Sequence, residues 1–225
     1  MLDAVIFDFD GIIVDTEPLH YKAFQEMLVP LGLGYSWEEY LETYLGFDDR
    51  DAFREAFRAA GRTLSPAELK SLMDGKAQAF LRIVAGGVPP YPGVVELIRS
   101  ISGTLPLALC SGALRGDIDP ILAQLGLVGA FDTLVTADEV AASKPDPESY
   151  RLAVQRLQEL FPGRVDPARS LAVEDTPAGI SSAKGAGLRV LAVTNSYPEE
   201  RLMGACRVVT SLAGVDLEAL RLLPC

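Results

Sequence analysis

Two pairs of acidic residues stand where short apolar runs end. Asp8 and Asp10 close a run near the N-terminus, and Glu174 and Asp175 follow a similar run much later in the chain. A lone acid after a strand is commonly a turn residue or a helix cap. Burying two acids in so apolar a setting is costly unless a cation or hydrogen bonds offset the lost hydration. Because such oxygen ligands suit a hard cation, the two pairs together indicate a magnesium site.

Two further segments carry groups that suit a phosphate. Ser111 and Gly112 follow an apolar run that ends at Cys110, and Lys144 lies in a proline-rich loop. Ser-Gly after a strand is commonly only a turn, and a loop lysine is usually just solvated. At the end of a strand, however, a hydroxyl and open amides can receive phosphate oxygens. A fixed ammonium can neutralise those oxygens or separate two carboxylates.

The elements that would position these groups alternate between strands and helices. Apolar runs typical of buried strands lie at residues 4–10, 105–110, 133–136, 170–173, 189–193 and 207–209. This alternation predicts an α/β fold with a doubly wound parallel sheet covered on both faces. All the polar groups then converge on one edge, because ligands bind at the carboxyl ends of the strands in such sheets. We also expect Thr176 to cap a helix that begins at Pro177, and Asp146 to cap one that begins at Pro147.

The pattern of apolar residues changes between the first two predicted strands. From about Glu17 to Val84 the periodicity is helical, with no convincing strand. About 70 residues are too many for one crossover connection, so we predict an inserted helical domain. The glycines and prolines at 86–90 mark the return to the sheet. The predicted limits are residues 1–14 and 89–225 for the core domain, and 15–88 for the insertion.

Composition excludes several classes of protein. The 225 residues are 49% hydrophobic and 23% charged, with a net charge of -11, one histidine and three cysteines. This balance predicts a globular chain that binds neither nucleic acid nor anionic membranes. His20 alone cannot build an imidazole-rich zinc site, so any metal must be held by oxygen. We expect reduced thiols, a cytoplasmic location, and a monomer, with a dimer as the alternative.

The four groups together resemble a known superfamily. Asp8-Phe9-Asp10-Gly11, Ser111, Lys144 and Glu174-Asp175 occur in the order and spacing of the haloacid dehalogenase-like (HAD) superfamily. The resemblance covers essentially the whole chain, and the combination is specific although each motif alone is weak. The stretch 7–17 is similar to the branch that contains phosphoglycolate phosphatases and beta-phosphoglucomutase. That branch carries a helical cap domain inserted after the first motif.

The resemblance implies a role for each residue. Asp8 would be the nucleophile that forms an aspartyl-phosphate, and Asp10 the general acid and then base. Mg²⁺ would be held by Asp8, the backbone carbonyl of Asp10 and Asp175, with Glu174 as a further candidate. The remaining polar groups would stabilise charge on the phosphoryl oxygens, and these are Ser111, the Gly112 amide and Lys144. The substrate would be a small phosphorylated metabolite, whose identity these motifs do not specify.

The superfamily also contains dehalogenases and enzymes that cleave carbon–phosphorus bonds. Members of both kinds lack an acid two residues after the nucleophile, so Asp10 argues against both reactions. Because every acid needed for chemistry is present, a catalytically silent module that binds a phosphorylated metabolite is the weaker alternative.

The choice between a phosphatase and a sugar phosphomutase depends on the cap. His20 and Lys76 fall where beta-phosphoglucomutase also carries a histidine and a cap lysine. The loop at 45–50 differs, because it reads Leu-Gly-Phe-Asp-Asp-Arg where the mutase has a lysine before the glycine. Two acids suit a second phosphate poorly, although Arg50 could contact one. We therefore favour the phosphatase, with His20, Arg50 and Lys76 as candidate substrate contacts; each is equally compatible with a purely structural or solvated position.

Overall fold

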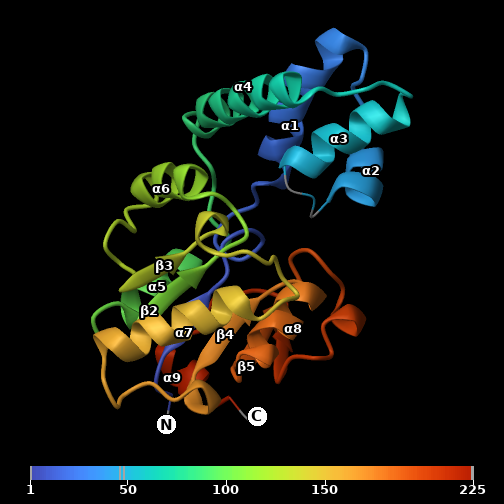
Figure 1. The fold of residues 1–225 in the computed structure, drawn as a ribbon. Helices are drawn as coiled ribbons and strands as arrows, with labels where there is room; N and C mark the ends of the chain where they lie inside the picture. Colours follow the sequence, from blue (N-terminus) through green and yellow to red (C-terminus); the bar gives the residue numbers. More distant parts are fainter. Residues whose placement is uncertain (1, 46, 48, 224–225) are drawn as a thin grey trace. The chain divides into compact units, whose positions relative to one another are not determined.

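The computed structural model describes residues 2–45, 47 and 49–223 and divides the chain into two compact units (Figure 1). One unit comprises residues 1–15 and 88–225, and the other comprises residues 16–87. The limits lie one residue from those expected for the core and the insertion. The first unit contains the sheet, and every regular element in the described part of the second is a helix.

The sheet has six parallel strands, in the order β3-β2-β1-β4-β5-β6. Chain order therefore reverses between β1 and β4, and this is the switch point at which doubly wound sheets bind ligands. The prediction of a doubly wound parallel sheet is confirmed. The strands are β1 (Val5–Phe7), β2 (Leu107–Cys110), β3 (Thr133–Val135), β4 (Leu171–Glu174), β5 (Arg189–Val193) and β6 (Arg207–Val209).

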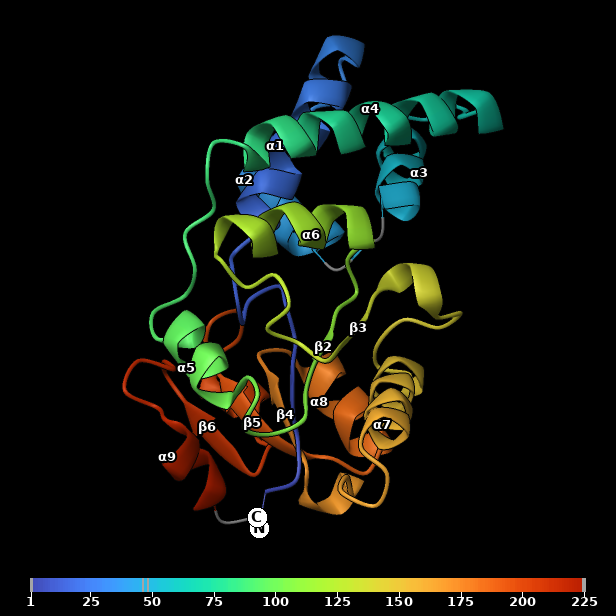
Figure 2. The same ribbon diagram turned by 90° about the vertical axis from the view of Figure 1, so that its left-hand side faces the viewer.

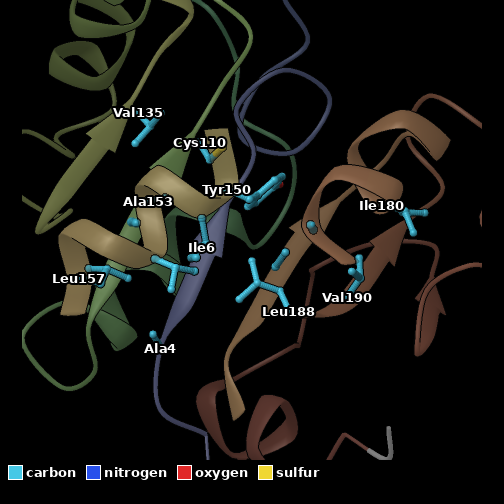
Figure 3. Packing of buried hydrophobic residues seen from close by; sticks show 14 of the residues in the cluster. Ala4, Ile6, Cys110, Val135, Tyr150, Ala153, Leu157, Ile180, Leu188 and Val190 are labelled. Carbon is cyan, nitrogen blue, oxygen red and sulfur yellow. The ribbon is translucent and has the colours of Figure 1, made fainter. Parts of the chain in front are cut away.

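Helices cover both faces of the sheet (Figure 2). On one face, Ile6 and Val190 pack with Tyr150, Leu157 and Ile180 in a single buried cluster (Figure 3). This cluster places α7 (Glu148–Leu160) and α8 (Pro177–Gly185) against that face. Alternate strand residues point to the other face, where α5 (Val94–Ile101) and α9 (Leu217–Arg221) contact each other. Helix α6 (Arg115–Gln124) and the short helices η3 (Ala137–Glu139), η4 (Pro167–Arg169) and η5 (Glu199–Arg201) complete the unit.

The helical unit has an aromatic core of its own. Phe24 and Phe53 meet edge to face with their ring centroids 5.2 Å apart, and Tyr35 stacks on Tyr44 at 4.1 Å. The longest helix begins with Ser65 and Glu68 in a reciprocal capping box. The helices are α1 (Glu17–Leu28), η1 (Val29–Leu31), α2 (Trp37–Glu39), η2 (Tyr40–Tyr44), α3 (Asp49–Ala59) and α4 (Pro66–Val84).

Several local expectations can be checked against the structure. The Thr176 hydroxyl accepts the Gly179 amide at the start of α8, as predicted. Helix α7 begins at Glu148, one residue later than expected, and Asp146 accepts the Glu148 amide at 2.9 Å. Strand β1 ends before the first acid of its run, so the expectation that both acids lie on the strand is wrong.

From composition we expected reduced thiols and no binding to anionic membranes. Cys110 is a buried free thiol, but Cys206 is disulfide-bonded, which corrects the expectation of reduced thiols throughout. None of the helices in the described part of the chain combines the length and apolar character that crossing a bilayer requires.

Candidate active site

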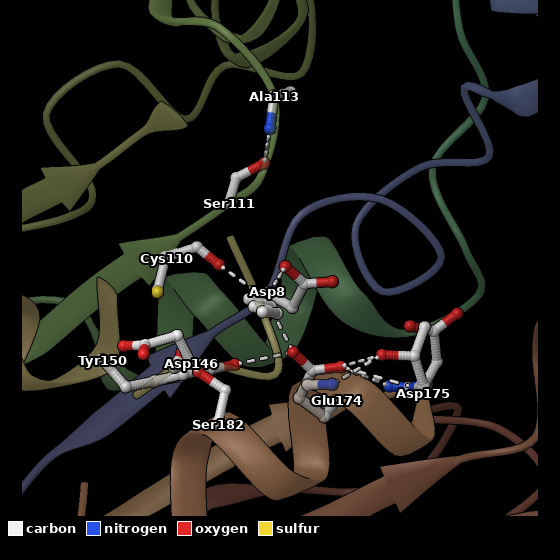
Figure 4. A network of polar contacts seen from close by, with 12 residues as sticks. Asp8, Cys110, Ser111, Ala113, Asp146, Tyr150, Glu174, Asp175 and Ser182 are labelled. Carbon is white, nitrogen blue, oxygen red and sulfur yellow. Dashed lines mark hydrogen bonds and ion pairs between the residues drawn. The ribbon is translucent and has the colours of Figure 1, made fainter. Parts of the chain in front are cut away.

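The switch point of the sheet brings two strand ends side by side. In the register of β1 and β4, Phe7 lies beside Val173, and the Asp8 amide donates to the Val173 carbonyl at 3.0 Å. Asp8 therefore leaves β1 beside Glu174, the last residue of β4. Oxygen atoms of Asp8, Glu174 and Asp175 lie within 4.8 Å of one another, and all three residues are buried (Figure 4). The predicted convergence of the two acidic pairs is thus present for these three acids.

Two glycines make room for Glu174 and Asp175. A Cβ atom on Gly11 would lie 1.9 Å from Asp175 Oδ2, and one on Gly179 would lie 1.9 Å from Glu174 Oε1. Gly11 also has a φ of +78°, which disfavours any side chain there. The Asn195 side chain donates to the Gly11 carbonyl at 2.6 Å and fixes this turn. The carboxylates therefore sit in a cradle that only glycine permits at both positions.

Lys144 is the cation of this group. Its ammonium donates to Asp8 Oδ1 at 2.6 Å, to Glu174 Oε1 at 2.7 Å and to the Cys110 carbonyl at 3.2 Å. These bonds use all three of its protons. Burial by itself lowers the pKa of Lys144, but Asp8 and Glu174 outweigh burial and hold the pKa well above its ordinary value. Lys144 thus stays charged and separates two carboxylates, one of the two roles expected for it.

The site carries more negative charge than Lys144 can balance. When all are ionised, the three carboxylates and one ammonium sum to a formal charge of -2. Burial and the neighbouring Glu174 raise the pKa of Asp8 well above its usual range. Burial likewise raises the pKa of Asp175 to about 7, although the Ser196 hydroxyl lies close enough to lower it. Buried excess charge of this kind calls for a cationic partner.

Asp175 provides the test of whether a metal fits. Both of its carboxylate oxygens are buried, and neither has a hydrogen-bond partner of standard geometry among the described residues. Buried carboxylate oxygens are otherwise nearly always paired. All the neighbouring side-chain donors are oxygens, which suit Mg²⁺ and do not suit soft metals. The residues present therefore fit a divalent magnesium ion.

The other predicted residues of this unit lie at the same edge of the sheet. Ser111 follows β2, is buried, and accepts the Ala113 amide with its hydroxyl at 2.9 Å. A Cβ atom on Gly112 would meet no described atom within 4 Å, so its backbone is open. Asp10 is half-buried, forms an isolated bridge with Val14, and contributes to the raised pKa of Asp175.

The helical unit contains a fully buried lysine of its own. Lys76 is 1% exposed, and its ammonium lies 2.7 Å from Asp49 Oδ1 and 2.8 Å from His20 Nδ1. The ammonium also lies 5.0 Å from the Phe24 ring centroid and 5.2 Å from that of Phe80, within cation–π range. The structure therefore brings together two of the three predicted cap residues and adds Asp49 to them.

The third predicted cap residue is exposed. Arg50 is exposed on α3, the helix that also carries Asp49. Gly46 and Asp48, which entered the comparison with the mutase loop, lie outside the described residues.

Sequence reasoning missed Tyr150 and Asn195, and it treated Asp49 only as a loop acid, without its contact to Lys76. Tyr150 is fully buried and donates its hydroxyl to Glu174 Oε1 at 2.9 Å, and its ring centroid lies 4.9 Å from the Lys144 ammonium. In the sequence it reads as one more apolar position of a core helix. Only its place three residues after the Pro147 of the lysine loop hints that it would face the site.

Comparison with known proteins identifies the family. The model of haloacid dehalogenase-like hydrolases matches residues 5–193, a span that contains Asp8, Ser111, Lys144 and Glu174. The chain belongs to this family. The helical unit, residues 16–87, lies inside the matched span and follows the first acidic motif.

Named members of the family resemble the chain over most of its length. Protein CbbY of Rhodobacter capsulatus is 34% identical, with 87% of each chain covered. Fructose-1-phosphate phosphatase YqaB of Escherichia coli is 32% identical over 82% of this chain and 92% of its own. Beta-phosphoglucomutase of Bacillus subtilis is 28% identical over 97% and 94%. The crystal structure of CbbY from Rhodobacter sphaeroides in complex with phosphate superposes with a TM-score of 0.87, at 29% identity, covering 99% of this chain and 100% of that one.

Proposed function

We propose that the protein is a magnesium-dependent phosphatase that hydrolyses a small phosphorylated metabolite through an aspartyl-phosphate. The observation that carries the proposal is the buried group of three carboxylates around Lys144, in which Asp175 keeps both oxygens unpaired within the described structure. Such a group has the charge and the open oxygens that a hard divalent ion requires. Family membership supports the reaction, because the span matched to these hydrolases, residues 5–193, contains Asp8.

In the proposed reaction, Lys144 fixes one oxygen of Asp8 and thereby orients the other toward phosphorus. The bond from Asp8 to phosphorus forms as the ester bond to the leaving oxygen breaks, and Asp10 donates a proton to that oxygen. Asp10 then accepts a proton from water as the water attacks phosphorus. The bond to Asp8 breaks, which releases inorganic phosphate and restores the free carboxylate.

Charge on the phosphoryl group needs stabilisation in both steps. We assign this role to Ser111, the Gly112 amide and Lys144. Asp8, Asp175 and the Asp10 carbonyl would hold Mg²⁺, with Glu174 beside them in the same acidic group. The ion would supply further positive charge for the phosphoryl oxygens.

We propose that residues 15–88 act as a cap domain and that residues 1–14 and 89–225 form the catalytic core. Caps of this kind exclude water and select the substrate. His20, Lys76 and Arg50 are the proposed substrate contacts of this domain. The relatives named as acting on fructose 1-phosphate and glucose phosphate make a phosphorylated sugar the substrate class to test first.

Lys76 favours a phosphatase over a sugar phosphomutase. A mutase must accommodate a bisphosphate, so its cap needs positive charge for the second phosphate. Asp49 already pairs with Lys76 at 2.7 Å. The helical unit as a whole has eleven acidic and eight basic residues. A neutralised lysine in an acidic unit suits the uncharged part of a monophosphate better than a second anion.

The test is turnover of a panel of sugar and polyol monophosphates, with Mg²⁺ or with a chelator. We expect release of inorganic phosphate with Mg²⁺ and none with the chelator, and equal turnover in both would contradict the metal role. Mg²⁺ at 100 times its Kd should also stabilise the fold by about 2.7 kcal/mol, measured by thermal unfolding. Asp175→Asn should abolish that stabilisation.

The mutase is the second candidate, because His20 and Lys76 occur together and a mutase is among the relatives. Incubation of a hexose 1-phosphate with a bisphosphate primer separates the two. Formation of the isomeric phosphate without net phosphate release would establish the mutase.

A further inference from the structure

Glu174 differs from its neighbour Asp175 in how its oxygens are used. Glu174 Oε1 accepts bonds from the Lys144 ammonium at 2.7 Å and from the Tyr150 hydroxyl at 2.9 Å. Glu174 Oε2 faces the Asp175 amide at 3.1 Å, and the amide and hydroxyl of Thr176 at 3.4 and 3.2 Å. Each carboxylate oxygen accepts about two hydrogen bonds. The described protein groups therefore occupy Glu174, whereas Asp175 has both oxygens open.

Tyr150 contacts both partners of the Glu174–Lys144 ion pair. Its hydroxyl binds the same oxygen of Glu174 that accepts the Lys144 ammonium, and its ring centroid lies 4.9 Å from that ammonium. The side chain is fully buried on α7, within the cluster that fixes this helix to the sheet. Figure 4 shows Glu174 between Tyr150 and Asp175. A rigid aromatic ring of this kind can hold both charged groups in one geometry.

We infer that Tyr150 is a positioning residue, and that the Glu174 it fixes serves to hold Lys144 beside Asp8 and is not a direct ligand of the metal. The chain of contacts runs from Tyr150 to Glu174, from Glu174 to Lys144, and from Lys144 to Asp8 Oδ1. The inference rests on the proposed phosphatase function. It assigns different roles to the two adjacent acids: Asp175 binds Mg²⁺, and Glu174 binds Lys144.

The first test removes only the hydroxyl, with Tyr150→Phe. A lost hydrogen bond to a charged group should lower kcat about tenfold. KM and the Kd for Mg²⁺, measured by calorimetry without substrate, should stay at their wild-type values. Tyr21→Phe is the matched control. Tyr21 and Tyr35 both lie in the helical unit, where the Tyr21 hydroxyl donates to the Tyr35 carbonyl at 3.0 Å. This control should match the stability loss of Tyr150→Phe without the loss of kcat.

Two results would overturn the inference. A Kd for Mg²⁺ at least about tenfold weaker in both Tyr150→Phe and Glu174→Gln would make Glu174 a metal ligand. An unchanged kcat in Tyr150→Phe, together with a lower melting temperature, would reduce Tyr150 to a packing residue.

A further arm does not depend on activity. Limited acetylation followed by mass spectrometry compares the labelling rate of Lys144 with that of Lys184, an exposed lysine whose ammonium donates to the Gly204 carbonyl. Loss of the hydroxyl should raise the relative labelling of Lys144 several-fold, and an unchanged ratio would overturn the inference. A wild-type protein that turns over no phosphate ester would refute the proposed function, and this arm would still decide the role of Tyr150.

Discussion

Each unit of the protein contains a lysine held by ion pairs, Lys144 in one and Lys76 in the other, and the charges around the two lysines are balanced differently. Lys144 lies between Asp8 and Glu174 with Asp175 close by, so its surroundings carry a surplus of negative charge. Lys76 meets one carboxylate, that of Asp49, together with a neutral imidazole and two aromatic rings. The Lys76 side chain is 1% exposed and that of Lys144 15%, so both lose hydration and both are held by ion pairs.

The difference indicates what each unit can bind. A surplus of buried carboxylate requires an added cation. A bound cation in turn attracts a phosphate group to the site. A balanced group of lysine, carboxylate and imidazole requires nothing more and offers hydrogen bonds without net charge. Replacing one carboxylate partner of Lys144 should therefore mainly lower activity, whereas replacing the carboxylate partner of Lys76 should mainly lower stability.

Asp8→Asn should produce the largest effect. Replacing the proposed nucleophile should lower turnover by roughly 10⁴-fold or more. Stability should change by less than about 1 kcal/mol, because Lys144 keeps Glu174 and the surplus negative charge falls. Phosphate release with Mg²⁺ and urea unfolding measure the two quantities. Substantial residual turnover in a fully folded variant would remove Asp8 from the proposed role.

Asp49→Asn should have the converse pattern. Lys76 is 1% exposed, so loss of its carboxylate partner leaves a buried charge poorly compensated. Because Asp49 is itself 23% exposed, we expect a stability loss of about 1–3 kcal/mol, smaller than for a fully buried pair. The uncovered ammonium should also lower the KM for a sugar bisphosphate relative to the matching monophosphate.

Asp51→Asn is the matched control on the same helix. Asp51 and its partner Arg54 are 61% and 59% exposed at a separation of 3.5 Å, so their pair is a surface ion pair. Its loss should change stability by less than about 0.5 kcal/mol. Equal losses in the two variants would show that burial of Lys76 does not govern the stability of the helical unit.

Much of this architecture was predictable from residue types alone. Buried parallel strands are apolar on both faces, so Leu107–Cys110 and Leu171–Glu174 are visible as runs that end in polar residues. Since parallel strands end at one edge, Asp8 and Glu174 could be brought together without knowledge of side-chain directions. The end of β1 was placed too late, because Phe9 extends the apolar pattern beyond the last strand residue.

The partners of the two lysines could not be predicted in this way. Asp49 and Lys76 are 27 residues apart on separate helices, and their contact depends on how those helices pack. Tyr150 follows the spacing of a core helix, and periodicity does not show which buried ring carries a hydroxyl that reaches a carboxylate. The disulfide at Cys206 was missed because the cysteine spacing matches no familiar framework.

The smallest expected effect tests whether the Lys76 group is neutral because His20 is neutral. Burial, and then the adjacent Lys76 ammonium, lower the pKa of His20 well below 6.5, and its ring stacks on Phe80 at 4.3 Å. Below pH 6.5 the unfolded chain therefore binds a proton that the folded chain rejects. His20 contributes a loss of stability as pH falls through this window, of at most about 1.4 kcal/mol per pH unit.

His20→Gln keeps an acceptor for Lys76 but cannot titrate, so the difference in stability between this variant and the wild type isolates the histidine. The subtraction is needed because the raised pKa values of Asp8 and Asp175 act in the opposite direction over the same window. Urea unfolding from about pH 7 to pH 5 should show the wild type losing stability relative to the variant. A difference that is constant with pH would mean that His20 accepts its proton in the folded state. In that case the Lys76 group would carry a net positive charge in acid, and the contrast between the two lysines would hold only near neutral pH.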